Sequence, residues 1–378
     1  MEPTSNSTLL ERVQEKINID VDTLDTEFIQ SLPIIPNDQT SNPAWLFVQL
    51  QDSGTKDLVH QLIQQDIELQ RRVAFCKRNL PFIKGRVMIQ ATTSDPYNIQ
   101  EILESARLLA KEFQRAGIPK ERYCIKIMAT GPGVIAAKIL GQPEEDDIPI
   151  LGTGVFTVAQ AVACFQARCL FISPYYNSIE EWQNLREQGN SVILPTPNDV
   201  ALKHPFSNRL AQMVKAYKDL YQKTGQRPPL IKNAGFASYH EVIASAEIGC
   251  HSATISTALL TEMLKPSIRR ISLPDNLPTK LANMRKPYET SVSIPSSRLQ
   301  GLLNADPLQR SSAKYKACDT DKDYLACGGD VLDKMIEGDV EGKKRLDQAL
   351  ELFRFADQAS LQLVQDLADE MARFSSNL

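Results

Sequence analysis

The chain has 378 residues, of which 42% are hydrophobic and 23% are charged, and its formal net charge is -4. These values are typical of a globular protein, and the length suits one large α/β barrel or two domains of medium size. The negative charge, the lack of a long basic run and the lack of a long apolar stretch argue against binding to nucleic acid and against a membrane span.

The cysteines and the two ends of the sequence indicate a reducing compartment. Seven cysteines are scattered along the chain, and this odd number favours free thiols over a disulfide framework. The first residues are polar and lack the charged and then apolar pattern of a secretion signal. The last three residues, Ser376-Asn377-Leu378, resemble a peroxisomal signal but lack its central basic residue. We therefore expect a cytoplasmic protein.

Taken in chain order, short apolar runs alternate with helical patterns. The runs predict eight strands at Ile17–Asp22, Asp38–Asn42, Arg86–Ala91, Tyr123–Ala129, Ile148–Thr153, Cys169–Ser173, Leu230–Gly235 and Ala253–Ser256. The helical patterns are clearest at Leu58–Leu80, Ile99–Ala116, Val134–Leu140, Val158–Ala167, Ile179–Gln188, Asn208–Thr224, His240–Ile248 and Ala258–Leu264. Such alternation predicts a single α/β (β/α)8 TIM barrel, and a doubly wound open sheet is the alternative.

The pattern divides the chain into three parts. Residues 1–16 are expected to form a flexible N-terminal segment, and residues 17–266 the barrel core. Residues 267–378 are expected to form a long loop region followed by extra C-terminal helices that pack on the barrel, because prolines and serines give way to a helical pattern there.

A lysine interrupts the apolar run Tyr123–Ala129, and it is the most informative residue of the chain. A run of this kind predicts a strand buried on both faces, where a charged Lys126 would be costly. Burial lowers the pKa of a lysine and favours the neutral amine, which attacks carbonyl carbons. The alternative is a structural lysine that reaches the rim of the sheet and pairs with a carboxylate.

Lys126 begins a longer motif, Lys-Ile-Met-Ala-Thr-x-x-Gly-Val-Ile-Ala-Ala, over residues 126–137. This segment resembles the strand that carries the Schiff-base lysine of the transaldolase family. Other similar segments keep the family's order and spacing, and they are Asp22–Asp25, Thr40–Pro43, Gly152–Ala161, Leu170–Tyr175 and Ala253–Leu260. The resemblance covers most of residues 17–265 and implies an enzyme without a cofactor that acts on a sugar or sugar phosphate, with a homodimer as an option.

The resemblance also implies roles for individual residues. Lys126 matches the lysine that forms an imine with the ketose carbonyl. Asp22 matches the carboxylate that assists proton transfer, and Asp20, on the same face of the strand, is the alternative. Asn42 matches a residue that contacts substrate hydroxyls, Thr153 one that holds a catalytic water, and Ser173 one that lines the pocket. Each of these residues also has a structural alternative, such as a helix cap, a turn or a strand-end hydroxyl.

Two positions depart from the family pattern near the catalytic water. The usual glutamate of the third strand is replaced by Gln90, which can orient a water but cannot take its proton. The usual phenylalanine of the sixth strand is replaced by Tyr175, whose hydroxyl can donate and accept protons. The combination resembles the fructose-6-phosphate aldolase branch of the family, which also takes unphosphorylated donors.

A third departure concerns the substrate phosphate. The two arginines that bind it in the family fall on Ser178 and Ala237, and neither replaces a guanidinium. Lys232 is the candidate substitute cation, and an unphosphorylated substrate is the alternative. The leading prediction remains transfer of a three-carbon ketol unit between sugar phosphates. The alternatives are an aldolase acting on a non-standard substrate and a barrel that has lost catalysis.

Two further motifs are weaker. Gly131-Pro-Gly133 has the form of a dinucleotide fingerprint, but no acid follows at the expected distance, so a nicotinamide-dependent oxidoreductase is only a third hypothesis. Asp319–Asp330 begins like a calcium loop but lacks its glycine and glutamate. Neither the cysteines nor the histidines show the spacing of a metal site, so no metal is expected.

Overall fold

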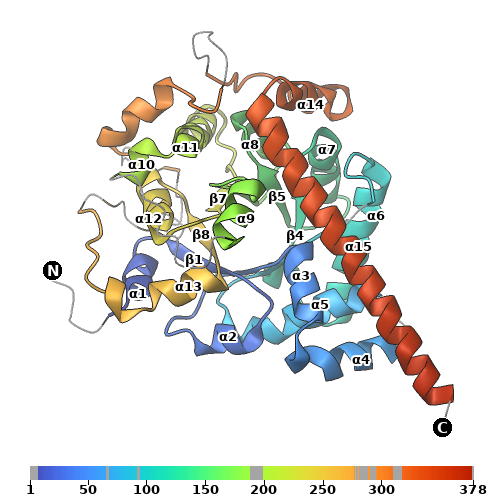
Figure 1. Ribbon diagram of the computed structural model, residues 1–378. Helices are drawn as coiled ribbons and strands as arrows, with labels where there is room; N and C mark the ends of the chain where they lie inside the picture. Colours follow the sequence, from blue (N-terminus) through green and yellow to red (C-terminus); the bar gives the residue numbers. More distant parts are fainter. Residues whose placement is uncertain are drawn as a thin grey trace.

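The computed structural model describes residues 7–64, 68–91, 94–187, 199–275, 277, 280, 288–289, 295–309 and 317–376. Eight parallel strands form a closed barrel in the order of the chain (Figure 1). They are β1 (Asn18–Asp22), β2 (Gln39–Thr40), β3 (Val87–Gln90), β4 (Tyr123–Met128), β5 (Ile150–Val155), β6 (Phe171–Pro174), β7 (Leu230–Asn233) and β8 (Ser252–Ser256). The predicted barrel is confirmed, and the open sheet is wrong because β8 pairs with β1.

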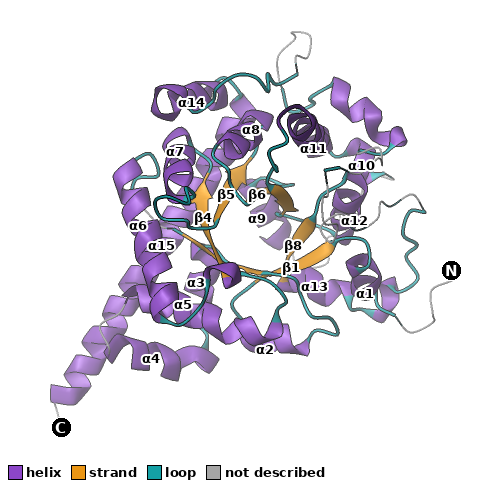
Figure 2. Cartoon of the chain, turned by 180° about the vertical axis from the view of Figure 1, so that it is seen from behind, coloured by secondary structure: helices purple, strands orange, loops and turns teal. Residues whose placement is uncertain are grey.

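A ring of helices covers the outside of the strands (Figure 2). The helices are α2 (Thr26–Ser31), α3 (Pro43–Leu50), α4 (Lys56–Gln64), α5 (Glu68–Asn79), α6 (Ile99–Arg115), α7 (Gly131–Leu140), α8 (Val158–Gln166), α10 (Val200–Lys203), α11 (Pro205–Thr224), α12 (Tyr239–Ile248) and α13 (Thr257–Met263). Helix α9 (Ile179–Glu187) instead lies in front of the strands in the view of Figure 1. Because helices bury the outer face of each strand and side chains fill the inside, all residues of β4 and β5 are buried.

Along β1, β4 and β6, inward-facing side chains lie two residues apart, in pairs such as Asp20 and Asp22, as the alternation of a strand requires. The first members form a lower layer at the N-terminal side, which includes Asp20, Cys124 and Phe171. The second members, such as Asp22 and Lys126, lie nearer the C-terminal ends of the strands, where barrel enzymes place their chemistry.

The N-terminal segment is more ordered than expected. Leu9–Gln14 form helix α1, whose start is fixed by a capping box between Thr8 and Glu11. Leu9, Leu10 and Val13 are buried in the hydrophobic core. The expectation of a flexible segment over residues 1–16 is therefore wrong for residues 9–14, because their apolar face packs on the barrel.

The C-terminal part contributes two helices, α14 (Asp330–Glu337) and α15 (Val340–Ser376). Helix α15 runs obliquely in front of the barrel mouth, against α3 and α9, and its end extends past α4 (Figure 1). This helix lies within the C-terminal part, for which the sequence predicted helices that pack on the barrel. Between the barrel and α14, the described residues form only short 3-10 turns such as Pro266–Ile268 and Ser297–Asn304.

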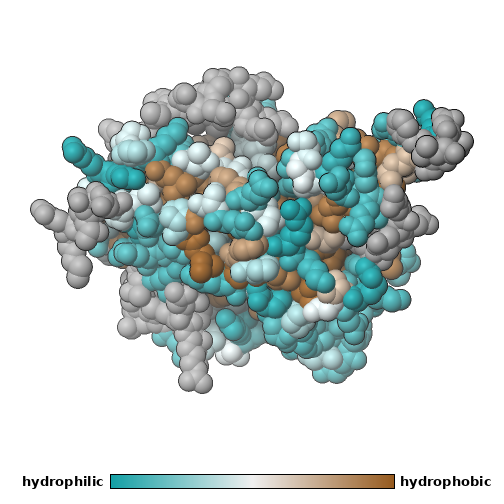
Figure 3. All heavy atoms as spheres, turned by 90° about the horizontal axis from the view of Figure 1, so that it is seen from below, coloured by the Kyte–Doolittle hydropathy of each residue, from teal (hydrophilic) through white to brown (hydrophobic). Residues whose placement is uncertain are grey.

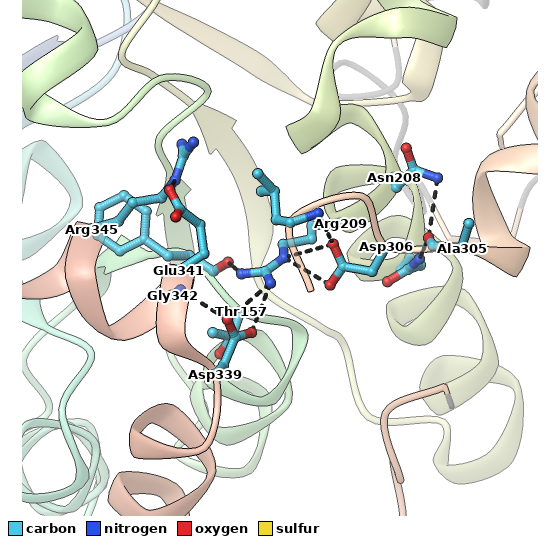
Figure 4. Close-up of polar contacts among 12 residues, drawn as sticks. Thr157, Asn208, Arg209, Ala305, Asp306, Asp339, Glu341, Gly342 and Arg345 are labelled. Atoms are coloured by element: carbon cyan, nitrogen blue, oxygen red, sulfur yellow. Dashed lines mark hydrogen bonds and ion pairs between the residues drawn. The ribbon is translucent and has the colours of Figure 1, made fainter. Parts of the chain in front are cut away.

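A buried arginine joins this C-terminal part to the barrel (Figure 4). Arg209 of α11 is 1% exposed, and its guanidinium binds Asp306 at 3.0 Å and Asp339 at 2.8 Å. A third hydrogen bond goes to the carbonyl oxygen of Phe156, after β5. Because two carboxylates from the C-terminal part share one barrel guanidinium, the start of α15 is held beside the mouth.

The outer surface is mixed in character. On the face seen in Figure 3, hydrophobic side chains are separated by hydrophilic ones. In the part of the chain that the structure describes, no helix combines the length and the apolar composition needed to cross a bilayer.

Candidate active site

A pocket of about 220 Å³ opens at the C-terminal ends of the strands. Its walls come from the ends of β1, β4, β6 and β8, the segments after β2, β6 and β7, and helices α3, α9 and α15. Its polar lining is Asp22, Thr40, Asn42, Lys126, Ser173, Tyr175, Asn177, Ser178, Thr254 and Ser256. Most of the predicted site residues therefore meet in one place, although they come from distant parts of the sequence.

Lys126 projects from β4 into this pocket and is 4% exposed. Its Nζ donates a hydrogen bond of 3.2 Å to the carbonyl oxygen of Ser41, after β2. Burial lowers the pKa of Lys126 below its ordinary value, and the charge of Asp22 only partly opposes this effect. The amine is thus largely shielded from solvent, and this burial favours its neutral, nucleophilic form.

Asp22 ends β1 and lines the same pocket. Its Oδ1 accepts a hydrogen bond of 2.8 Å from the Thr40 hydroxyl, and its Oδ2 one of 2.7 Å from the indole nitrogen of Trp45. Burial raises the pKa of Asp22, while Lys126 and the two donors lower it. The helix cap that was the alternative role falls instead on Asp25, whose carboxylate accepts the amide of Phe28.

Thr153 and Tyr175 form a hydroxyl pair beside the lysine strand. The Thr153 Oγ1 and the Tyr175 hydroxyl oxygen are 3.0 Å apart, on the neighbouring strand β5 and just after β6. Tyr175 lines the pocket, whereas Thr153 is fully buried behind it. Burial raises the pKa of Tyr175 well above its ordinary value, so the phenol keeps its proton and can donate it in a hydrogen bond.

Gln90 is the register partner of Lys126 on β3, yet it does not line this pocket. It borders a neighbouring cavity on the other side of Phe353, together with Met128 and residues of α15. Its Oε1 is buried and has no hydrogen-bond partner within the described protein. The structure thus separates Gln90 from the pocket that holds Lys126 and Tyr175.

Three predicted substrate-binding residues do line the pocket: Asn42, Ser173 and Ser178. Two of them also cap helices. The Asn42 Oδ1 accepts the amides of Ala44 and Trp45 at the start of α3, and the Ser178 hydroxyl accepts the amide of Glu181 in α9. The structural and functional readings of Asn42 are therefore compatible, because its amide nitrogen is left for another partner.

Lys232, expected as a cation for the substrate, does not line the pocket. Lys232 belongs to the lower layer, and its Nζ binds Asp20 at 2.8 Å and also Asp38, with all three side chains buried. Burial lowers the pKa of Lys232, but the two carboxylates outweigh that effect and raise it above the ordinary value. Asp20, the alternative to Asp22, is removed from the pocket by the same ion pairs.

Sequence reasoning missed the apolar half of the pocket. Four aromatic side chains and several aliphatic ones line it: Trp45, Val48, Ile179, Trp182, Phe236, Leu352 and Phe353. The last two come from α15, more than two hundred positions beyond Lys126, so no local pattern could place them there. Trp45 had a signal, because it stands three residues after Asn42 and therefore on the same face of the first helical turn.

The turn at Gly131 does not bind a dinucleotide. Its backbone amide, at the start of α7, donates a hydrogen bond of 2.7 Å to the carboxylate of Asp333 from α14. A side chain at Gly131 would collide with the carbonyl oxygen of Gly329. An internal carboxylate and backbone thus occupy the position that a pyrophosphate would need. Among the described residues, no group of three His, Cys, Asp or Glu side chains is arranged for a metal ion.

The sequence is similar to a family of known proteins. Residues 19–291 match the model of the family described as "Transaldolase/Fructose-6-phosphate aldolase". A transaldolase of Prochlorococcus marinus (strain MIT 9211) is 26% identical over 80% of this chain and 86% of its own. A transaldolase of Methylococcus capsulatus is 28% identical over 68% of this chain and 77% of its own. A probable transaldolase of Drosophila melanogaster is 26% identical over 79% of this chain and 88% of its own.

The matched region contains all eight strands, except for the first residue of β1. It also contains every described barrel residue that lines the pocket. The chain therefore belongs to the transaldolase/fructose-6-phosphate aldolase family and is an enzyme of the transaldolase, class I aldolase type.

Proposed function

We propose that Lys126 is the nucleophile that carries a three-carbon ketol unit from a ketose donor to an aldehyde acceptor. The observation that supports this assignment is a buried amine with a lowered pKa in the same pocket as a half-buried aspartate. Schiff-base chemistry needs a neutral amine to attack and a nearby group to move protons. Lys126 and Asp22 have these properties.

In the first step, the Lys126 amine attacks the carbonyl carbon of the ketose, and loss of water gives an iminium ion. The bond between the third and fourth carbons then breaks, and its electron pair moves to the iminium to form an enamine. The proton of the hydroxyl on the fourth carbon passes to Asp22, and an aldehyde leaves. The raised pKa of Asp22 brings its proton affinity closer to that required for reversible transfer near neutral pH.

The remaining steps reverse this order with a new partner. The enamine attacks the carbonyl carbon of the acceptor aldehyde, Asp22 returns its proton to the new hydroxyl, and water hydrolyses the imine to release the product. We assign the positioning of that water to the Thr153–Tyr175 pair, which lies 3.0 Å apart at the pocket wall. Gln90 was expected to share this role, and its unpartnered Oε1 leaves it able to bind a water of the neighbouring cavity.

Binding of the donor is assigned to Asn42 and Ser173, whose polar groups line the pocket on either side of Lys126. The substrate is a small sugar or sugar derivative, and we expect no nucleic-acid partner. A cytoplasmic location and a homodimer remain predictions from the sequence and its resemblance.

Transfer of an isotope label tests the proposal. A ketose labelled in its first three carbons is incubated with an unlabelled aldehyde, and the product ketose is analysed by mass spectrometry. We expect the label in the product with the unaltered enzyme and none with Lys126→Ala. A barrel that has lost catalysis would give no labelled product with any pair, and label transfer by Lys126→Ala would refute the assignment of the nucleophile.

A further inference from the structure

The pocket holds little positive charge for a phosphate group. Among the lining residues that the structure describes, Lys126 is the only lysine or arginine, and the proposed function uses this amine for imine formation. Asp22 is the only carboxylate among these described residues, so a phosphorylated substrate would bring its charge near another anion. Proteins bind phosphate mainly through arginine, lysine or helix N-termini.

Helix α9 begins at the pocket wall, but its N-terminus already binds an internal carboxylate. The amide of Ser178, a lining residue, donates a hydrogen bond of 2.6 Å to Glu181 Oε2. The same oxygen lies 3.3 Å from the guanidinium of Arg345 in α15. Arg345 is 1% exposed, also binds Glu341 at 2.9 Å and does not line the pocket. Arg345 therefore pairs with two acids of the protein, behind the residues that line the pocket.

The N-terminus of α12 is occupied in the same way. Glu241 Oε2 accepts hydrogen bonds from the Ala237 amide, at 2.7 Å, and from the Asn177 side chain, at 2.8 Å. Burial raises the pKa of Glu241 to about 7, against the effect of these donors. Asn177 and Phe236 line the pocket, so this carboxyl group lies directly behind its wall. A phosphate in front of them would face a buried acid instead of a free cation.

The rest of the wall is apolar and aromatic. Trp45, Trp182, Phe236 and Phe353 approach the pocket from α3, α9, the β7–α12 segment and α15. Burial of an apolar ligand group against such a surface favours binding, whereas burial of a hydrated phosphate does not. The pocket volume is about 220 Å³. Typical ligand pockets have volumes of roughly 300–1,000 Å³, so this pocket suits a smaller molecule than they do.

We infer that this enzyme transfers its ketol unit between unphosphorylated partners, a small neutral donor and an acceptor aldehyde that carries an apolar or aromatic group. The inference rests on the proposed function, because it names the substrate class of the same pocket. The ketol end binds among Lys126, Asp22 and Asn42, and the apolar group of the acceptor lies against Trp182 and Phe353.

A comparison of acceptors tests the inference. With dihydroxyacetone as donor, kcat/KM is measured for phenylacetaldehyde, glyceraldehyde and glyceraldehyde 3-phosphate. We expect kcat/KM for phenylacetaldehyde to exceed kcat/KM for glyceraldehyde 3-phosphate by at least about tenfold, which is the size of effect that apolar pockets produce. Inorganic phosphate is expected not to inhibit. A higher kcat/KM for glyceraldehyde 3-phosphate than for glyceraldehyde, or competitive inhibition by inorganic phosphate, would overturn the inference.

Two variants locate the cause of the preference. Trp182→Ala is expected to lower kcat/KM for phenylacetaldehyde more than kcat/KM for glyceraldehyde, whereas Trp182→Phe keeps the preference. Glu241→Gln removes the acid behind the pocket wall. It is expected to raise kcat/KM for glyceraldehyde 3-phosphate relative to kcat/KM for glyceraldehyde. Equal loss for both acceptors in Trp182→Ala would contradict the apolar contact.

Trapping separates the two levels of the argument. If borohydride traps a ketose on Lys126 but phosphorylated substrates react best, only the inference about substrate class fails. If no ketose is trapped on Lys126, free or phosphorylated, the proposed function itself fails.

Discussion

Lys126 and Asp22 lie in one pocket, and each opposes the effect of burial on the other. Burial lowers the pKa of Lys126 and raises that of Asp22, and the charge of each partner partly reverses the shift of the other. Burial thereby brings the pKa of each group nearer to neutral pH than the pKa of an exposed lysine or aspartate. A pair of this kind can form an imine and exchange protons without large changes in solvent pH.

Replacement of the lysine by a residue of similar shape separates activity from stability. We expect Lys126→Met to lower kcat by at least about 10³-fold, because the covalent nucleophile is lost. The variant should also be more stable at neutral pH by about 1 kcal/mol, since it no longer buries an ionisable amine. Steady-state kinetics and urea unfolding measure the two effects. A variant that is both inactive and strongly destabilised would indicate a structural lysine.

The pH dependence of stability follows from the same lowered pKa. Between the pKa of Lys126 in the folded protein and its ordinary value, the unfolded chain binds more protons. The free energy of unfolding is therefore expected to rise with pH through this window, and this contribution should be absent in Lys126→Met. The measurement is a set of unfolding curves for both proteins at pH values from about 7 to about 10, a range that ends near the ordinary lysine pKa of ~10.4. Identical pH slopes would contradict the lowered pKa.

Removal of the carboxylate should leave the imine but slow the bond-breaking step. Asp22→Asn can offer its oxygen to the Trp45 indole and its amide nitrogen to the Thr40 hydroxyl, which can accept as well as donate, so the fold is expected to persist. We expect kcat to fall by about 10²–10⁴-fold. The apparent pKa of Lys126 should fall further, because the nearby negative charge that raises it is gone. Trapping of the donor on Lys126 with little turnover is the predicted result, and unchanged kcat would assign proton transfer to another group.

A lysine of the lower layer provides a contrast to these variants. Lys232→Met leaves Asp20 and Asp38 buried without their cation, and we expect a loss of roughly 3–5 kcal/mol in the free energy of unfolding. Thermal unfolding detects a change of this size. A stable Lys232→Met variant with a selective defect for phosphorylated substrates would instead restore the role that the sequence first suggested for this residue.

The tyrosine hydroxyl can be removed without removing the ring. Tyr175→Phe breaks the contact of 3.0 Å with Thr153 but keeps the aromatic wall. If the pair positions the hydrolytic water, release of the product becomes slow, by about 10²-fold or more. The covalent adduct should then form a larger fraction of the enzyme during turnover, as measured by mass spectrometry after rapid reduction. An unchanged adduct fraction would place the water elsewhere.

The strands and most of the polar site were predictable from the sequence, for a physical reason. Strands of a parallel barrel are buried on both faces, so they stand out as apolar runs, and Lys126 stands out within its run. Asp22 and Asn42 were indicated by the resemblance to the transaldolase family, and both line the pocket at the C-terminal strand ends. These features are local, and each can be recognised within a few residues.

Depth inside the barrel and contacts from remote helices were not predictable in this way. The alternation of β7 shows that Lys232 faces inward, but only its ion pairs with Asp20 and Asp38 place it in the lower layer. The neighbouring cavity that holds Gln90 is separated by Phe353 of α15, and no pattern near Gln90 indicates that helix. The acid behind the pocket wall, Glu241, reads in the sequence as an ordinary first-turn residue of α12.

The most direct test of the account is reduction of the enzyme with borohydride in the presence of dihydroxyacetone, followed by peptide mass spectrometry. The account predicts one reduced three-carbon adduct, located on the peptide that contains Lys126 and absent from the Lys126→Met variant. An active enzyme whose Lys126 peptide keeps its original mass under these conditions would contradict the central claim.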